Sequence, residues 1–534
     1  MIAGCCFTLG GIIMNTFLRA GILSCAVLST AVSPALAETQ PAADAASKPV
    51  DDKASNFVHC DGKPNKESSL GIAARVVALS LVVGLLIPPP EEPDAKKRMT
   101  GQDGIKACDA ALNGDEKASD GGRRLELILG RAVHRMEISD WQGAIDDIHS
   151  LPVDQPQLTS TRAYRQSLGQ TAAYLEAISL EAKGDGAGAA ALGYRIGEES
   201  PYDPYTVPLA IRLILPQDGY GPEKKQLLDR AVRLNPMASL SRAGARAGAG
   251  DFSGAGDDFS AIADLLGTIP TVPSYAARGQ AAIGYRLAGK AQTAEDLMSA
   301  SQKMVDADAA DGKHAPEIDS YREASDFYTI VKAMDDGQAV RARNMFSAHS
   351  HWRSVNYGYV MEMARRLQSV GTVEEQAMSP IQTPAQILGD YNKAIVAAVT
   401  SRGDKGDQYW HYFIPANSDA AYGKFSENVW RGKNSRYINK TPDKDVNAQL
   451  VDTRSDGTGI PCAYALYMHL AVVAKAQGKT GFMVLPAQRN LCAVYFRIGN
   501  ADDKDMIAPF MANADQVIAD LSTYFPNPDT ARGN

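Results

Sequence analysis

The histidine and cysteine residues are the side chains of this sequence best suited to metal chemistry, and their spacing argues against a metal centre. No His-Glu-x-x-His helix and no Cys-x-x-Cys pair occurs, and His349-Ser-His351 has no third ligand nearby. The stretch from Asp306 resembles a calcium loop, but Asp311 stands at its glycine position and Ala310 at a ligand position. We therefore predict no metal and no cofactor.

Motifs that carry catalysis are also missing from the sequence. It has no phosphate-binding Walker loop, no dinucleotide fingerprint and no Gly-x-Ser-x-Gly elbow. The aromatic cluster Trp410-His411-Tyr412 is the best candidate for a sugar or peptide site, although an aromatic core plug is the favoured interpretation. We predict a protein that is not an enzyme. The alternative is an envelope enzyme, or a glycan- or peptide-binding protein, with its site in residues 403–500.

The cysteines predict disulfides. The chain has seven, and three of them, Cys5, Cys6 and Cys25, precede a predicted cleavage site after Ala37. The remaining four are an even number, which favours pairing in an oxidising compartment. Three connectivities are open, and local pairing is the economical choice. The predicted pairs are Cys60–Cys108 and Cys462–Cys492.

Residues 1–37 have the pattern of a signal peptide, with Met14 as an alternative start. Arg19 supplies the positive region, an apolar run follows, and Ala35-Leu36-Ala37 has the small residues that signal peptidase accepts. Cleavage would export the protein to the periplasm. A lipoprotein anchored at Cys25 is an alternative, because Ile22-Leu23-Ser24-Cys25 resembles a lipobox.

A second apolar run covers residues 70–87, within a predicted N-terminal helical segment of residues 38–103. Its length just reaches that of a membrane span, and Lys96, Lys97 and Arg98 follow it as a basic flank. Arg75 lies inside the run, where a charge would be costly in a membrane. A buried helix is therefore favoured over a membrane tether.

Composition and charge narrow the class of partner. The chain has 534 residues, with 45% hydrophobic and 22% charged residues, and a formal net charge of −8. These values are ordinary for a globular protein, and a mildly acidic chain without a basic block offers no footprint for nucleic acid. We expect a protein or peptide partner, whose identity the sequence does not give.

Residues 104–370 repeat one device of helix–turn–helix packing. A Gly-Asp-like turn is followed five residues after its first member by alanine, and often preceded by another alanine seven residues earlier. Small residues at these places allow two antiparallel helices to approach closely, and glycine ends the first helix in a left-handed conformation. The turns begin at Ser139, Gly184, Gly250, Gly289 and Gly337, so their spacings are 45, 66, 39 and 48 residues.

This device resembles the tetratricopeptide repeat, a 34-residue helix–turn–helix unit. Tyr285 and Phe346 match aromatic positions of that family, and Pro156 and Pro201 match its terminal proline. The resemblance implies a degenerate α-solenoid whose concave face binds segments of other proteins. For the candidate partner groove, inter-repeat packing is the favoured interpretation of each residue; the groove comprises Tyr174, Ile178, Glu181, Ile283, Arg286, Phe327 and Met334.

Residues 385–534 are predicted to form a C-terminal α+β domain that caps the repeats. An apolar helix over 463–477 precedes two strand-like runs, 481–485 and 492–498, whose short polar connection predicts a β-hairpin. A last helix is expected over 515–524. The predicted fold class is thus mainly α, a TPR-like solenoid of antiparallel helix pairs with a small α+β domain. The predicted function is a periplasmic scaffold or adaptor for protein–protein interaction.

Overall fold

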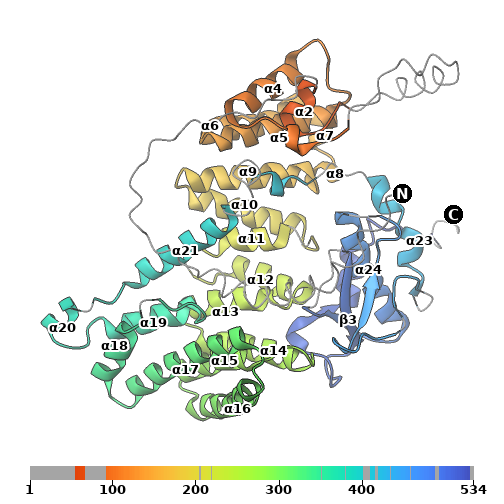
Figure 1. Ribbon diagram of the computed structural model, residues 1–534. Coiled ribbons are helices and arrows are strands. Elements are labelled where there is room, and N and C mark those ends of the chain that lie inside the picture. Colours follow the sequence, from red (N-terminus) through yellow and green to blue (C-terminus); the bar gives the residue numbers. More distant parts are fainter. Residues whose placement is uncertain are drawn as a thin grey trace. The chain divides into compact units, whose positions relative to one another are not determined.

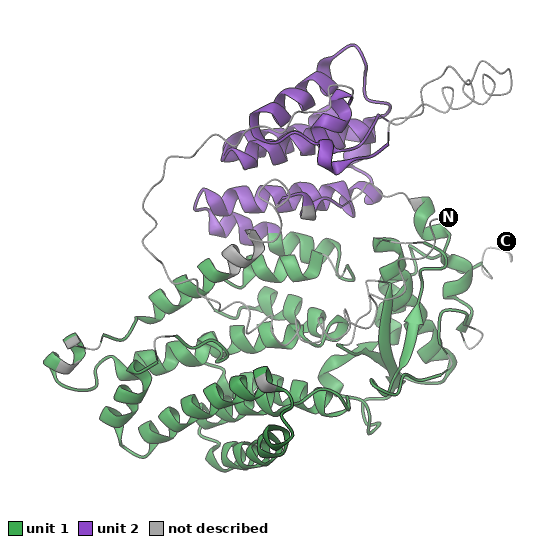
Figure 2. Cartoon of the chain, in the orientation of Figure 1, with its two compact units in different colours: residues 1–30, 193–398, 420–534 green, residues 31–192, 399–419 purple. Residues whose placement is uncertain are grey.

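The structure is a computed structural model in which most described residues are helical (Figure 1). The described residues are 54–65, 92–203, 206–217, 219–349, 351–378, 380–400, 409–414, 419–432, 435–439, 441–457, 459–486 and 492–528. The predicted signal peptide, the lipobox and the apolar run 70–87 lie outside them. By packing, the chain divides into two units, drawn in different colours in Figure 2.

Unit 2 contains the described residues of 31–192 and 399–419. Its helices form around a core in which α4 packs on α5, and α5 on α6 and α9. The chain passes into unit 1 within α10. The elements are α2 (Asn56–Asp61), η3 (Ala95–Lys97), α4 (Gly101–Asn113), α5 (Gly121–Glu137), α6 (Trp141–Asp154), α7 (Pro156–Thr159), α8 (Arg162–Arg165), α9 (Leu168–Ala182), α10 (Gly186–Glu199) and the 3₁₀ turn η4 (Trp410–Tyr412).

Unit 1 contains the described residues of 193–398 and 420–534. Consecutive helices α13, α14, α15 and α16 pack on one another, and α17 packs on α15. The helices before the sheet are α11 (Thr206–Ile214), α12 (Pro222–Leu234), α13 (Ala238–Gly248), α14 (Phe252–Gly267), α15 (Tyr275–Leu287), α16 (Ala291–Ala310), α17 (Ala315–Asp335), α18 (Ala339–Ser347), α19 (Tyr357–Leu367), α20 (Val373–Met378), α21 (Pro384–Thr400), α22 (Asp419–Gly423) and α23 (Ser426–Val429).

The five predicted turns share one backbone geometry. Each first member has a positive φ, between 63° at Ser139 and 87° at Gly184. The next residue donates its N–H to the carbonyl five positions back, as Asp140 does to Arg135 at 2.8 Å. The flanking alanines are at most 1% exposed, which confirms the small-residue crossings: Ala132, Ala144, Ala177, Ala189, Ala243, Ala255, Ala282, Ala294 and Ala342. The packing device is confirmed.

The C-terminal residues form the expected α+β structure, with a larger sheet than predicted. The hairpin is confirmed, since β2 (Gly481–Val484) pairs antiparallel with β3 (Ala493–Gly499). Two short strands extend it to the order β1-β3-β2-β4, namely β1 (Gln449–Asp452) and β4 (Met511–Asn513). Around the sheet lie α24 (Ile460–Ala476), η6 (Ala508–Phe510) and α25 (Ala514–Leu521).

This sheet is buried against helices of the same unit. Met483 and Tyr495 from the strands share a core with Val232 of α12 and Ile262 of α14. The hydroxyl of Tyr467 in α24 donates to the carbonyl of Leu234 at 3.3 Å. The predicted cap therefore packs on α12 and α14, in the middle of the helical run.

Candidate functional site

Residues 409–414, which we call the aromatic segment, lie against helices of unit 2 that are far away in sequence. Tyr409 and Tyr412 are buried, whereas Trp410 and Phe413 are half-buried. Tyr409 belongs to the same core as Phe57 and Leu129. The predicted aromatic cluster is thus docked on the N-terminal helices, through contacts that also make it part of their core.

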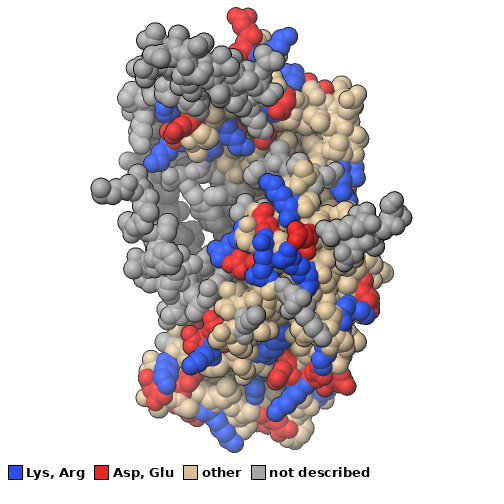
Figure 3. Space-filling view, turned by 90° about the vertical axis from the view of Figure 1, so that its right-hand side faces the viewer, with Lys and Arg blue, Asp and Glu red and all other residues tan. Residues whose placement is uncertain are grey.

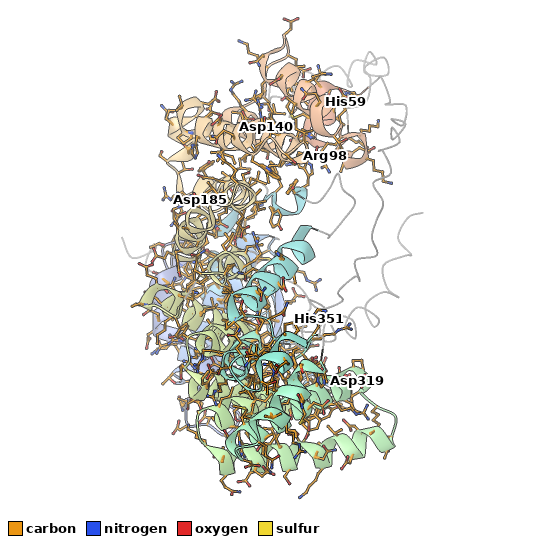
Figure 4. All side chains as sticks on the ribbon, turned by 90° about the vertical axis from the view of Figure 1, so that its left-hand side faces the viewer. His59, Arg98, Asp140, Asp185, Asp319 and His351 are labelled. Atoms are coloured by element: carbon orange, nitrogen blue, oxygen red, sulfur yellow. A yellow bond between two sulfur atoms is a disulfide. The ribbon has the colours of Figure 1, made fainter. Side chains whose placement is uncertain are left out.

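The indole of Trp410 occupies a pocket of four residues, which we call the Trp410 pocket. The guanidinium of Arg98, labelled in Figure 4, lies over the indole face with its central carbon 4.0 Å from the ring centroid. His134 presents its ring at an interplanar angle of 61° and a centroid distance of 5.5 Å. A Cβ at Gly130 would lie only 3.3 Å from Trp410 Cη2, so the absence of a side chain at Gly130 lets the indole ring pack closely against α5. The fourth residue is Glu137.

Glu137, the last residue of α5, contacts three nitrogen atoms with one carboxylate. Its Oε2 accepts from the backbone N–H of Gly101 at 2.6 Å and lies 2.8 Å from His134 Nδ1. Its Oε1 accepts from the Trp410 indole N–H at 3.4 Å. The side chain is only 7% exposed. A carboxylate in this setting is well matched to an indole N–H, which is a donor only.

His134 is fully buried and is held between two acceptors. Its Nε2 lies 2.7 Å from the carbonyl oxygen of Cys60, and its Nδ1 faces Glu137. The ring approaches α4 so closely that a Cβ at Gly104 would meet it at 2.4 Å. The pocket wall is therefore fixed from two helices.

Thr171 of α9 holds the backbone of the aromatic segment. Its hydroxyl donates to the carbonyl of Tyr412 at 3.2 Å and accepts from the backbone N–H of Ile414 at 2.8 Å. Thr171 is fully buried, so its bond to the Tyr412 carbonyl forms away from water, whereas the bond from Ile414 is partly buried. Main-chain hydrogen bonds of this kind are independent of the side chains that the segment carries.

The other aromatic rings of the segment also have partners in unit 2. Phe413 stacks on Trp410 at 5.6 Å and has the ammonium of Lys63 5.2 Å from its centroid. Tyr409 meets Trp141 edge to face at 6.4 Å, and Tyr412 lies 6.2 Å from Tyr174. Every ring of the segment whose side chain is described thus contacts a ring or a cation.

An ion network centred on the buried carboxylate of Asp147 fixes the α5–α6 helix pair beside this site. Arg131 forms two hydrogen bonds to the Asp147 carboxylate, at 2.6 and 3.0 Å, and a third to Asp109 of α4 at 2.6 Å. Arg135 bonds both Asp147 and Asp140. The hydrogen bond from Arg135 lowers the pKa of Asp140, against the opposing effect of burial.

The same network recurs in unit 1, 111 residues further along the chain. Arg242 bonds Asp258 as Arg131 bonds Asp147, and its third bond goes to Asp229 of the preceding helix α12. The two stretches share arginine, alanine, glycine and aspartate at matching positions from residues 131–148 and 242–259. This likeness was readable from the sequence as an internal repeat, although the turns alone gave only irregular spacings.

The predicted groove residues lie mainly inside the cores. Ile283 and Phe327 are fully buried, and Arg286 is 9% exposed and bonds Asp335 at 2.7 Å. In unit 2, Tyr174 is buried, and Ile178 packs against the core to which Tyr409 belongs. Glu181 and Met334 are half-buried. Only Tyr174 and Ile178 belong to the part of unit 2 that receives the aromatic segment.

Both predicted cysteine pairs are at disulfide distance. Their Cα–Cα separations are 4.7 Å for Cys60–Cys108 and 5.4 Å for Cys462–Cys492. The first pair joins α2 to α4 beneath the Trp410 pocket, since the carbonyl of Cys60 also bonds His134. Two disulfides are compatible with an oxidising compartment.

A serine–histidine contact occurs in the C-terminal residues of unit 1. Ser435 Oγ lies 2.5 Å from His469 Nε2, and His469 Nδ1 lies 2.8 Å from the carbonyl of Val429. Burial lowers the pKa of His469 to about 4, so its ring is neutral and its Nε2 accepts a hydrogen bond from the Ser435 hydroxyl. Ser435 Oγ also accepts the N–H groups of Tyr437 and Ile438, which makes it a turn anchor.

Asp456 is the acceptor for a second group of polar side chains, which come from residues adjacent in sequence to Ser435 and Val429. It accepts hydrogen bonds from Asn428, Arg436 and the hydroxyl of Tyr437. Burial and the hydrogen bond to Asp456 raise the pKa of Tyr437 above its usual range. These bonds tie the 435–439 segment to α23 and to the loop after β1.

Neither a metal cluster nor a membrane span is found among the residues that the structure describes. No group of three or more histidine, cysteine, aspartate or glutamate side chains is placed to hold an ion there. Across the same residues, each helix is too short or too polar to cross a bilayer. On the face in Figure 3, acidic and basic side chains are interspersed.

Sequence reasoning missed Arg98, Gly130, His134, Glu137 and Thr171 as parts of one site. The three-residue spacing of His134 and Glu137 puts them on one helix face, which is the only local signal. Nothing local connects Thr171 with Tyr412, 241 residues later.

Searches of protein-family models, of curated proteins and of solved structures find no match to this chain.

Proposed function

We propose that the protein is an exported, periplasmic scaffold or adaptor that binds protein partners through its helical surface and catalyses no reaction. Export is supported by the signal-peptide pattern of residues 1–37, and an oxidising compartment by the two cysteine pairs. The recurring turns and alanine crossings support a degenerate TPR-like solenoid as the architecture.

The observation that carries the proposal is the docking of the aromatic segment on the N-terminal helices of unit 2. Thr171 bonds its backbone, and Arg98 and Glu137 contact its tryptophan, as a helical groove would hold a bound peptide. A surface that already holds one short segment, a 3₁₀ turn followed by extended backbone at Phe413, has the donors, acceptors and ring contacts needed for another.

The test is a capture experiment in periplasmic extract of the native host. The bait is the full chain, and the comparison variant is Thr171→Val, which keeps the shape of the side chain but loses both backbone bonds. We expect a saturable partner that the wild type retains and the variant loses at least fivefold. Equal recovery by both proteins, or no saturable partner, would refute binding at this surface.

Localisation is tested on the same material. Amino-terminal sequencing of the mature chain is expected to begin at Glu38, after cleavage behind Ala37. A mature chain that still begins at Met1 or Met14 and remains in the cytoplasmic fraction would remove the periplasmic part of the proposal.

The second candidate function is an envelope enzyme acting on a glycan or peptide from residues 403–500. The Ser435–His469 contact favours it, because a neutral histidine beside a hydroxyl can act as its base. Against it, the serine oxygen already accepts two backbone N–H groups. A fluorophosphonate probe is expected to leave Ser435 unlabelled; labelling that Ser435→Ala abolishes would favour the enzyme.

A further inference from the structure

We infer that the Trp410 pocket is a recognition site for a tryptophan-containing segment of a partner protein, and that the aromatic segment of this chain is its intramolecular competitor. The inference rests on the proposed function, since it names the chemistry of the partner and a means of regulating its binding.

The pocket selects for tryptophan through three contacts that no other side chain makes together. Arg98 covers a flat ring face, Glu137 accepts an N–H from the ring edge, and Gly130 leaves depth for the six-membered ring. A phenylalanine ring lacks the N–H donor, and a tyrosine hydroxyl points along the ring axis instead of from its side.

The residues after the tryptophan define the rest of the pattern. Two positions on, a carbonyl accepts from Thr171, and four positions on, an N–H donates to it. Three positions on, the ring of Phe413 contacts both Trp410 and the ammonium of Lys63. The expected partner motif is Trp-x-x-aromatic, in a turn that opens into an extended chain.

The chain's own segment is placed for exchange. Trp410 and Phe413 are half-buried, so the anchoring rings border the solvent. The contacts that hold them are non-covalent, and a cation over a ring at such a site contributes on the order of 1 kcal/mol. Release of the segment also exposes the buried rings of Tyr409 and Tyr412, and it remains a local opening that costs less than unfolding of the whole domain.

The test uses the full chain and a fluorescein-labelled peptide with the sequence of residues 406–416. In Trp410→Ala the competitor loses its anchor, and we expect peptide binding at least tenfold tighter than in the wild type. The matched control is Trp430→Ala, because the Trp430 indole bonds the carbonyl of Phe525 in unit 1. It should bind the peptide as the wild type does.

Two further arms keep the result interpretable. Adding Thr171→Val to Trp410→Ala, or replacing the peptide tryptophan by alanine, should abolish the gain. If Trp410→Ala does not fold, excess peptide added to the wild type should increase hydrogen exchange at residues 409–414 by at least fivefold. Equal binding by wild type and Trp410→Ala, or an equally effective alanine peptide, would overturn the inference.

Failure of the inference is separable from failure of the scaffold function. A periplasmic partner that is retained equally by wild type and Trp410→Ala, and that excess peptide does not displace, would leave the scaffold standing and remove this site. Peptide binding as expected without any periplasmic partner would keep the site and remove the scaffold.

Discussion

Arg98 covers the face of Trp410, with its guanidinium carbon 4.0 Å from the indole centroid. In the sequence, Arg98 belongs to a basic cluster that would equally flank a membrane span. In the structure it clamps a residue that follows more than three hundred positions later. The contact joins the N-terminal helices to the aromatic segment within unit 2.

Removal of this cation is expected to loosen the aromatic segment without unfolding the helices. Arg98→Ala should cost about 0.5–1 kcal/mol of docking free energy, the usual contribution of a cation over an indole at a partly exposed site. With fluorotryptophan-labelled protein, the Trp410 resonance should shift and broaden. The control Arg322→Ala removes an exposed arginine paired with Asp319 and should leave it in place; equal shifts in both variants would contradict the clamp.

The two ion networks predict that loss of the central aspartate destabilises the protein more in unit 1 than in unit 2. Asp258→Asn leaves Arg242 buried beside a neutral amide, and loss of a buried partner costs roughly 3–5 kcal/mol. Asp147→Asn should cost less, since its partner Arg131 is 19% exposed and Arg242 only 8%. Urea denaturation measures both effects. Asp319→Asn, at an exposed surface pair, should change stability by less than about 0.5 kcal/mol. A larger cost for Asp147→Asn than for Asp258→Asn would contradict the expected order.

His469 predicts a pH dependence of unit 1. Its folded pKa of about 4 lies below the ordinary value of 6.5, so the unfolded chain binds the proton first as the pH falls. Stability is then highest above pH 6.5 and decreases towards pH 4, by on the order of 3 kcal/mol. Denaturation curves at pH 7 and pH 4.5 measure the loss.

The control for this prediction is a substitution of an exposed histidine. His149 is 61% exposed, and His149→Gln should keep the full pH dependence. His469→Gln should remove most of the histidine contribution over the same range. If both variants keep the wild-type profile, His469 is not the group responsible.

Reduction of the disulfides is expected to lower the melting temperature of the protein. The Cys60–Cys108 pair closes a loop of 48 residues and the Cys462–Cys492 pair one of 30. In the chain-entropy model each contributes about 4 kcal/mol. Calorimetry with and without reductant, on wild type and on the Cys60→Ser/Cys108→Ser double variant, measures the effect. An unchanged melting temperature would mean that the cysteines are unpaired.

The helix–turn–helix geometry could be predicted from the sequence because its causes are local. A glycine at Gly250 and alanines at Ala243 and Ala255 are sufficient to specify a left-handed turn and a close crossing. The β2–β3 hairpin is local in the same sense. Strands β1 and β4 were missed because neither pairs with its neighbour along the chain: β1 becomes a strand by pairing with β3, and β4 by pairing with β2.

The candidate site could not be predicted, because it is assembled from residues without local signals. Trp410 was identified as an aromatic cluster, and its role as a plug was the favoured interpretation. No local pattern in the sequence indicates which helices the aromatic segment contacts. Thr171 and Glu137 differ from other helix residues only through their hydrogen bonds to this segment. The 111-residue repeat of the arginine–aspartate network was visible, and a search for matched charges would have found it.

The most direct measurement of the central claim is site-specific photo-crosslinking in the native envelope. A photoreactive amino acid at Lys63, which faces Phe413, is compared with one at Arg322 on unit 1. Partner binding at this surface predicts a discrete intermolecular product from position 63 only, which excess 406–416 peptide removes. An intramolecular product alone at position 63, unchanged by the peptide, would contradict it.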